Sequence, residues 1–399
     1  MKKLLLLLLC IPLILFSCSN NKVGISITLE MPIKDILVSL SGNNKDTTFR
    51  KTLQKAVKNM ENSPGKTLVD LFANEFDPEG MELSYIFGTR FLRHKVQGKN
   101  NTEVIKVIDW EVTEAIESSV IILQERLANF NFGWGKNANI SRTKISNRVI
   151  VELPKGLDSS EINRIEMLLR SQSQLEFWET FEFHEVFEDL QNANLHLASK
   201  NGFVKDTTDT DSIFLALENP WFAVCGIPQG YQGIGPVIGY TLLKDTSTLN
   251  SYINDEEFMS NFDPDIKFAF AFVPGDETKE TFFVIALKRK GPNGYVMDGS
   301  VISDANSFID DGQVRISMSM NADGANIWKT TTGSNIGRSV AIVLDGYVKS
   351  WPTVNSEIPN GRSEITGNFT VNEGKDLANI LKSGKLPAGF DIVQIRKSN

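Results

Sequence analysis

Cys18 is the residue whose surroundings point most directly to chemistry. Two lysines precede an apolar run over residues 4–16, the pattern of a signal peptide that is too short to span a bilayer. A leucine three positions before Cys18 and Ser17 immediately before it have the order of a lipobox, in which the cysteine sulfur is acylated. The sequence therefore predicts a lipoprotein signal peptide over residues 1–17, lipidation at Cys18 and a tether over residues 18–22. Ordinary cleavage after a small residue is the alternative.

The predicted lipid places the chain in the cell envelope. Two or three acyl chains anchor a protein stably to a membrane, whereas one chain binds only marginally. We expect a lipid-anchored protein outside the cytoplasm, facing the periplasm. The net charge of −8 argues against nucleic acid as a partner, because phosphate binding needs a basic footprint. After maturation Cys225 is the remaining thiol, which excludes an internal disulfide.

Other residue types with catalytic potential have unsuitable spacing. The histidines His94, His184 and His196 do not stand at metal-ligand spacing, and we expect His184 at the surface beyond a strand. Residues 65–67 end like a phosphate-binding loop, but methionine occupies position 60, where that motif needs glycine. Residues 233–239 lack the dinucleotide glycine pattern and predict a turn. We therefore predict no catalytic, cofactor-binding or metal-binding residues, and no enzyme.

Three further groups have a structural and a functional interpretation. The aspartates of residues 206–211 are too loosely spaced for a calcium loop, which favours a solvated loop. Cys225 lies in an apolar stretch, where a buried, inert thiol is favoured over a nucleophile. Met318 and Met320 alternate on a predicted strand, which favours core, and an adaptable client-binding face is the alternative.

The elements expected in residues 23–183 follow the order strand, helix, strand, strand, helix, strand. They are a strand at 24–30, an amphipathic helix at 102–130, strands at 138–145 and 148–153, a helix opened by a capping box at Asp158 and Glu161, and a strand at 175–183. This order predicts a ferredoxin-like βαββαβ base with a helical insertion at 33–95.

The second half of the chain predicts another α+β unit. Residues 184–280 have a weaker pattern, and we expect a connector with partial structure there. Alternating strands and two helices return over residues 281–387, which we predict to be a head domain. Residues 388–399 contain a last strand that could return to the base. The predicted fold class is therefore α+β, a base with an inserted head.

Four segments carry a more specific pattern. Residues 363–373 read SEITGNFTVNE and lead into a helix that ends in KSGKLPA at 382–388. The others are NRVIVELP at 147–154, LEFWET at 175–180 and GRSVAIVLDG at 337–346. Together they resemble the first periplasmic domain, base and head, of the SecD/SecDF protein translocase family. The resemblance covers about residues 24–395 and is weakest at 184–280.

The chain also departs from that family. SecD domains of this kind follow a transmembrane helix and a Leu-Gly-Leu-Asp-Leu-x-Gly-Gly signature, whereas residues 19–23 stand at that place here. We expect a lipoprotein without the transmembrane helices that couple SecD to the proton gradient, and no cofactor.

The resemblance implies a membrane-anchored, non-catalytic module that binds emerging unfolded polypeptide, or translocon subunits, during protein export. One alternative is an envelope interaction lipoprotein, a repurposed SecD domain with a different partner. Another is an enzyme hidden in residues 184–280.

Replacing Cys18 by Ser should leave an unacylated precursor, because the acceptor sulfur is lost. Mass spectrometry of the envelope fraction checks this result. A mature wild-type protein that begins at another residue and carries no acyl chain would contradict the predicted anchor.

Overall fold

The computed structural model describes most of the chain after the leader. The described residues are 23–63, 65–76, 82–89, 92–133, 135–143, 147–200, 217–227, 235–273, 276, 278, 280–291, 293–367 and 369–397. The predicted signal peptide, Cys18, the tether and the aspartates of residues 206–211 lie outside them.

The first and last described strands lie side by side in the base. The base sheet has the antiparallel strand order β14-β1-β3-β2. Its strands are β1 (Val23–Glu30), β2 (Asn139–Arg142), β3 (Arg148–Pro154) and β14 (Asp391–Lys397). Alternate residues of β1 (Ile25, Ile27, Leu29) are buried, and those between them are partly exposed. Successive side chains of a strand point to opposite faces of the sheet, so this alternation means that one face is covered and the other is partly open.

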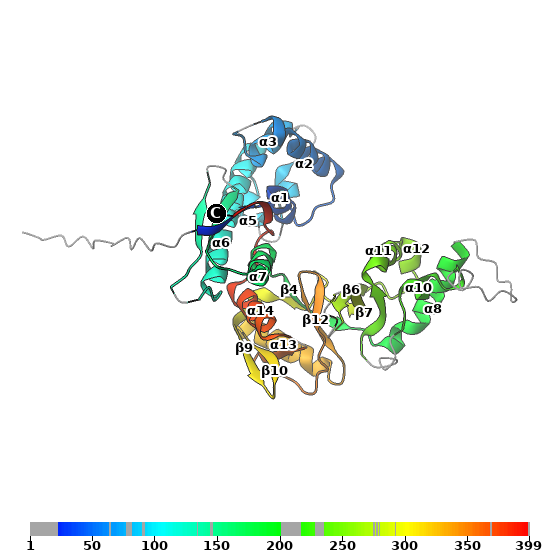
Figure 1. The fold of residues 1–399 in the computed structure, drawn as a ribbon. Coiled ribbons are helices and arrows are strands. Elements are labelled where there is room, and N and C mark those ends of the chain that lie inside the picture. Colours follow the sequence, from blue (N-terminus) through cyan, green and yellow to red (C-terminus); the bar gives the residue numbers. More distant parts are fainter. Residues whose placement is uncertain are drawn as a thin grey trace, which may run out of the picture.

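Two capped helices cover that face, α6 (Asn101–Ala128) and α7 (Ser159–Arg170). Each begins with a capping box in which side chain and backbone bond reciprocally. Between β1 and α6 lie short helices, of which α1, α3, α4 and α5 pack on α6 and α2 packs on α3 (Figure 1). They are α1 (Ile33–Leu40), α2 (Thr47–Asn59), α3 (Leu68–Glu75), α4 (Leu83–Ile86), α5 (Arg93–Val96) and the 3₁₀ turn η1 (Met60–Asn62). Edge-to-face contacts of Phe49 with Phe72 and Phe87 join these short helices to one another.

The strand predicted at 175–183 does not belong to the base, so that prediction is wrong. The strand, β4 (Leu175–Thr180), pairs with β11 in a second sheet of order β5-β7-β6-β12-β11-β4-β8. The other strands are β5 (Val237–Leu242), β6 (Ile266–Phe272), β7 (Thr281–Lys288), β8 (Met297–Asp298), β11 (Val340–Leu344) and β12 (Tyr347–Ser350). Every residue of β4 is buried. A strand of this kind needs cover on both faces, which the base sheet does not provide.

The second sheet curls until two of its inner strands meet. β4 also pairs with β7, so that β7, β6, β12, β11 and β4 form a closed ring. The inside of the ring is filled by side chains from all of these strands, including Trp178, Leu287, Ala271, Val343 and Val348. Closure removes exposed strand edges and encloses a core that needs no covering helix.

The stretch predicted as a connector at 184–280 has its own core in the described residues, so the connector prediction is wrong for them. It contains α8 (Phe183–Lys200), α10 (Pro220–Val224), α11 (Thr246–Ile253), α12 (Glu256–Met259), the turn η2 (Leu243–Asp245), and strands β5 and β6. Trp221 is fully buried and stacks on Phe258 with ring centroids 5.2 Å apart. These helices are short and depend on aromatic packing, which a periodicity pattern detects poorly.

A third sheet, of order β13-β10-β9, carries the last helix of the chain. Its strands are β9 (Ile302–Asp310), β10 (Gln313–Met320) and β13 (Arg362–Thr366), and the helices beside it are α13 (Ala322–Ser334), α14 (Val371–Ser383) and the turn η3 (Gly299–Val301). A Cβ at Gly374 would lie 2.4 Å from Val314, so the close approach of α14 to this sheet requires glycine. Within the described part of the chain, no helix combines the length and the apolar character needed to cross a bilayer.

Arg126 of α6 joins the base (residues 23–170 and 391–397) to the head (residues 175–383). Its side chain is fully buried. Its five N–H groups donate to the carbonyl oxygens of Leu168 (2.7 Å), Ser171 (2.6 Å) and Gly384 (3.1 Å), and to the hydroxyls of Ser383 (3.2 Å) and Ser173. These acceptors lie at the carboxyl ends of α7 and α14 and in both chain segments that connect base and head. One side chain therefore fixes both connections.

The charge of Arg126 is retained although the residue is buried. Burial lowers its pKa to about 10, so the guanidinium stays protonated at neutral pH. The carboxyl ends of helices carry partial negative charge, which favours a cation there. Nearby, Arg164 of α7 forms a bidentate pair with Asp376 of α14, at 2.7 and 2.8 Å. The two helix ends are thus held by charge-assisted hydrogen bonds.

Deleting residues 388–399 should destabilise the base as well as the head, with the largest loss of protection in β1, the strand that pairs with β14. β14 pairs with β1 from Ile25 to Glu30, and its loss would expose that edge. Hydrogen exchange measures this effect by comparing the β1 amides of the base and the β10 amides of the head between the two proteins. Unchanged protection of the β1 amides would contradict a base completed by the last strand.

Replacing Arg126 by Met should lower the free energy of unfolding by about 3–5 kcal/mol, because buried carbonyls lose their donors. The matched control is Arg170→Met at an exposed position of the same junction, which should change stability by about 0.5 kcal/mol or less. Denaturant unfolding compares the two variants. Equal effects would mean that the hydrogen bonds of Arg126 are not what holds the junction.

Candidate functional site: an aromatic surface on the head

The three histidines singled out in the sequence lie on two helices. His94 is exposed on α5, and His184 and His196 lie on α8, so His184 is at the surface but within a helix. Among the described residues, no group of three or more His, Cys, Asp or Glu side chains could hold a metal ion.

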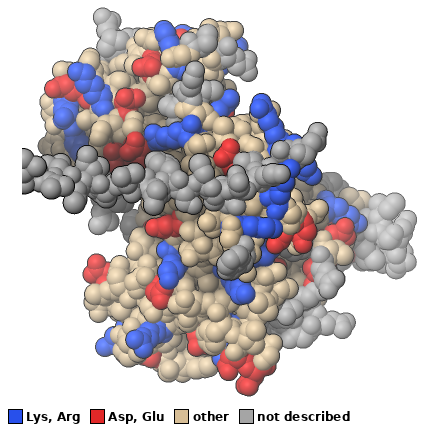
Figure 2. Space-filling view, turned by 60° about the vertical axis from the view of Figure 1, so that its left-hand side comes forward, with Lys and Arg blue, Asp and Glu red and all other residues tan. Residues whose placement is uncertain are grey.

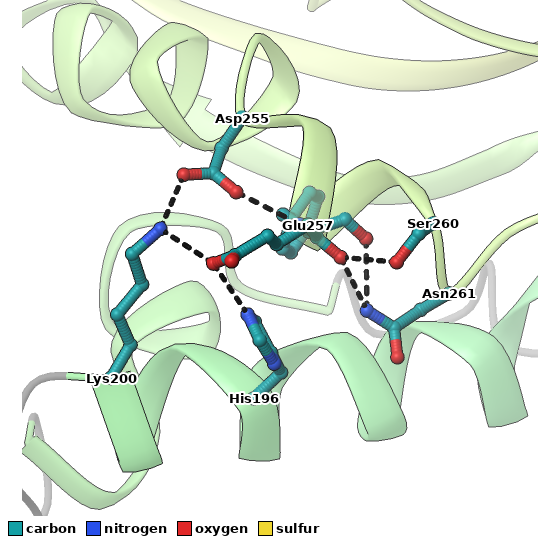
Figure 3. A network of polar contacts seen from close by, with 7 residues as sticks. His196, Lys200, Asp255, Glu257, Ser260 and Asn261 are labelled. Atoms are coloured by element: carbon teal, nitrogen blue, oxygen red, sulfur yellow. Dashed lines mark hydrogen bonds and ion pairs between the residues drawn. The ribbon is translucent and has the colours of Figure 1, made fainter.

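His196 is part of a polar network between α8 and α12 (Figure 3). Lys200 Nζ lies 2.7 Å from Asp255 Oδ2 and 3.0 Å from Glu257 Oε2, and His196 Nε2 lies 3.5 Å from the same Glu257 oxygen. The hydrogen bond from Lys200 lowers the pKa of both Asp255 and Glu257. Asp255 also accepts from the Phe258 amide and caps α12. The network attaches the short helix α12 to the long helix α8, and we assign it a structural role.

Cys225, Met318 and Met320 are core residues. Burial raises the pKa of the Cys225 thiol, so this thiol is not a reactive thiolate at neutral pH. Met318 is 1% exposed and Met320 8% exposed, so neither side chain offers a client-binding face. The interpretation of these residues as core is confirmed.

The Ile-Thr-Gly segment and the helix after it have structural roles. Ile365 is fully buried in β13. Thr370 and Glu373 form the capping box of α14, and Gly384 follows that helix with φ +84°, which a residue with a side chain rarely adopts. Asn368 lies outside the described residues.

A group of aromatic side chains lies where β6, β7 and β12 come together on the outside of the ring. We call Phe270, Phe272, Phe282 and Tyr347 the aromatic group. Phe272 stacks on Tyr347 with centroids 5.5 Å apart, and Phe282 lies 4.8 Å from Phe272. Tyr347 is 42% exposed and Phe272 half-buried. These rings extend the apolar face that α8 and α10–α12 cover further along the sheet.

A positive charge borders this group. Lys349 Nζ lies 5.8 Å from the ring centroid of Phe272 and 5.9 Å from that of Tyr347. Ammonium groups at this distance are attracted to ring faces. The aromatic group thus offers apolar area together with a cation, which suits contact with apolar side chains and carbonyl groups of a peptide.

Charges of both signs are interspersed on the surface around these parts. Figure 2 shows Lys and Arg beside Asp and Glu over the visible face, with broad neutral areas between them.

The sequence analysis missed the aromatic group. Its signal is present as alternate phenylalanines at 268, 270 and 272 in a segment assigned to the connector. Finding the group required the pairing of β6 with β7 and β12, since Phe282 and Tyr347 are distant in sequence.

Residues 275–388 match the family model of the SecDF P1 head subdomain. The protein translocase subunit SecD of Rhodothermus marinus is 29% identical over 394 residues, which is 94% of this chain and 61% of that protein. SecD of Desulfurispirillum indicum is 46% identical over 81 residues, 20% of this chain and 16% of that protein. The chain thus spans about three fifths of the Rhodothermus relative and much less of the other.

A solved structure titled "Structure and function of a membrane component SecDF that enhances protein export" aligns at 20% identity. It covers 72% of this chain and 94% of that one with a TM-score of 0.39, which is too low to carry an argument about the fold. The sequence matches do not depend on that alignment. They show that this chain is similar to SecD over 94% of its length, and that its residues 275–388 match the model of the SecDF P1 head subdomain.

Proposed function

We propose that this chain is a lipid-anchored, non-catalytic SecD-like module of the cell envelope that binds unfolded polypeptide, or translocon subunits, during protein export. The observation that carries the proposal is the similarity to a protein translocase subunit over 94% of the chain. The predicted lipid at Cys18 would hold the module at a membrane, facing the periplasm.

The base supports a SecD-like architecture. Numbered along the chain, its strands have the order 4-1-3-2, with α6 after the first and α7 after the third. We infer from this order a ferredoxin-like βαββαβ unit, in which the head is inserted between the second helix and the fourth strand. The head would then be carried on two adjacent connections, both of which Arg126 contacts.

The aromatic group supports the binding role. An unfolded client has no fixed sequence at the contact, so its binding site needs apolar area and adaptable polar contacts. Tyr347 and Phe272 supply the area, and Lys349 supplies a donor for peptide carbonyls. Binding of this kind needs no bond-breaking step, so we propose that the module acts without turnover, nucleotide or metal.

Tyr347→Ser should weaken the binding of a permanently unfolded secretory polypeptide about fivefold, since one partly exposed aromatic contact contributes roughly 1 kcal/mol. The control is Tyr85→Ser on the base, where the tyrosine is 80% exposed and outside the aromatic group. Fluorescence anisotropy with a labelled polypeptide gives both affinities. Equal affinities of the two variants, or binding that requires nucleotide or metal, would count against the proposal.

The same prediction can be tested in intact cells. A photoreactive phenylalanine at position 347, or at exposed Asn326 of α13, should capture translocating chains or translocon subunits. Asn335, also on the head, is not a suitable position for the probe, because its side chain is buried and donates hydrogen bonds to Glu179 and to the Thr331 carbonyl. The same probe at exposed Gln124 of the base is the control. Capture only of unrelated envelope proteins would favour the alternative, a repurposed SecD domain with a different partner.

A further inference from the structure

Helix α2 divides its side chains sharply between two faces. Phe49, Leu53 and Ala56 are buried. Lys51, Lys55 and Lys58 have the same i, i+4, i+7 spacing, shifted by two residues, and all three are exposed. A shift of two residues turns the helix by about 200°, so the lysine stripe lies opposite the buried stripe.

The outward face of α2 is strongly basic in an acidic protein. The 13 residues of α2 include Arg50 and the three lysines, and no acidic residue. Exposed Lys45 and Lys66 flank the helix on either side. The whole chain has a net charge of −8, so this local excess of basic residues is opposite in sign to the charge of the whole chain.

Two of the described acidic groups near these lysines are already engaged in contacts of their own. Lys55 pairs with Glu75 of α3 at 2.5 Å, and Asp46 is engaged in capping α2 through the Phe49 amide. Neither Lys51 nor Lys58 has an ion-pair partner among the described side chains. Like charges at i+3 and i+4 destabilise a helix, and an external anionic surface relieves that repulsion.

We propose that the lysine face of α2 binds a membrane surface through anionic lipid headgroups. This proposal rests on the proposed function in one respect, the acylation of Cys18. Residues 18–22 can span at most about 18 Å at roughly 3.5 Å per residue, so the anchored base stays close to the bilayer. Such a tether raises the effective concentration of the base at the membrane surface. A weak electrostatic contact is then enough to keep the lysine face on the lipid headgroups.

The position of α2 fits this role. Figure 1 shows α2 and α3 at the end of the molecule away from α13 and α14. The apolar face of α2 is used inside the protein, so contact is electrostatic without insertion, and its strength should fall with salt. A membrane contact at this end leaves the head free.

The test uses the chain from residue 19 onward, which keeps every helix and strand given above and lacks the acylation site. It should sediment with vesicles containing phosphatidylglycerol at low salt, and much less at high salt or with phosphatidylcholine vesicles. Each basic residue at an anionic surface contributes about a factor of five, so Lys51→Gln with Lys58→Gln should weaken partitioning about 25-fold.

The matched control is Lys244→Gln with Lys375→Gln, which removes the same charge from exposed positions of the head. Equal loss in the two double variants would overturn the proposal, since it would mean a response to net charge alone. Binding to soluble polyglutamate without binding to vesicles would overturn the lipid assignment. Neither result bears on the binding of unfolded polypeptide, which is measured separately.

Discussion

The hydrogen bonds of Arg126 are the interaction on which the arrangement of base and head depends. The chain leaves the base after α7 and returns to it after α14, so two segments connect the base with the head. Both segments contain hydrogen-bond acceptors of Arg126. The acceptors are neutral oxygens at helix carboxyl ends, so the dipoles of α7 and α14 stabilise the buried cation without a carboxylate in contact. Because Arg126 uses all of its donors, the usual penalty for burying a guanidinium is offset by hydrogen bonds.

The consequence of this junction is a shared core. Buried residues of the base sheet, such as Ile27 and Val151, belong to the same apolar cluster as Phe177, Trp328 and Ile342 of the head. β4 begins just after the segment that Arg126 holds, and it reaches directly into the head sheet. Its outer face joins that cluster, while Trp178 points into the closed ring. The strand is buried on both sides because it separates two cores.

The functional surfaces follow from what the cores leave uncovered. The helices α8 and α10–α12 cover only part of the ring, and the aromatic group is the continuation of the same apolar face beyond them. Away from that region (Figure 1), α2 packs against α3, and its lysines are exposed. The proposed peptide-binding surface and the proposed membrane-binding surface lie on different elements, so both could be occupied at the same time.

Local chemistry could be predicted from sequence because it depends on neighbours a few residues apart. The capping box at Asp158, the long helix α6 and the core role of Met318 are of this kind. The lipobox at Cys18 remains a prediction from sequence alone.

Partner choice among strands was decided only by the tertiary structure. The pattern of residues 175–183 identified a strand but placed it in the wrong sheet, since a buried strand has the same periodicity whichever sheet it joins. The burial of Arg126 and the assembly of Phe272, Phe282 and Tyr347 were equally invisible, because their contacts join segments far apart in the chain. The sequence by itself indicated the main elements outside residues 184–280 and the resemblance to SecD. Which surfaces those elements bury together, and so which ones remain to bind a partner, depended on long-range packing that no local pattern encodes.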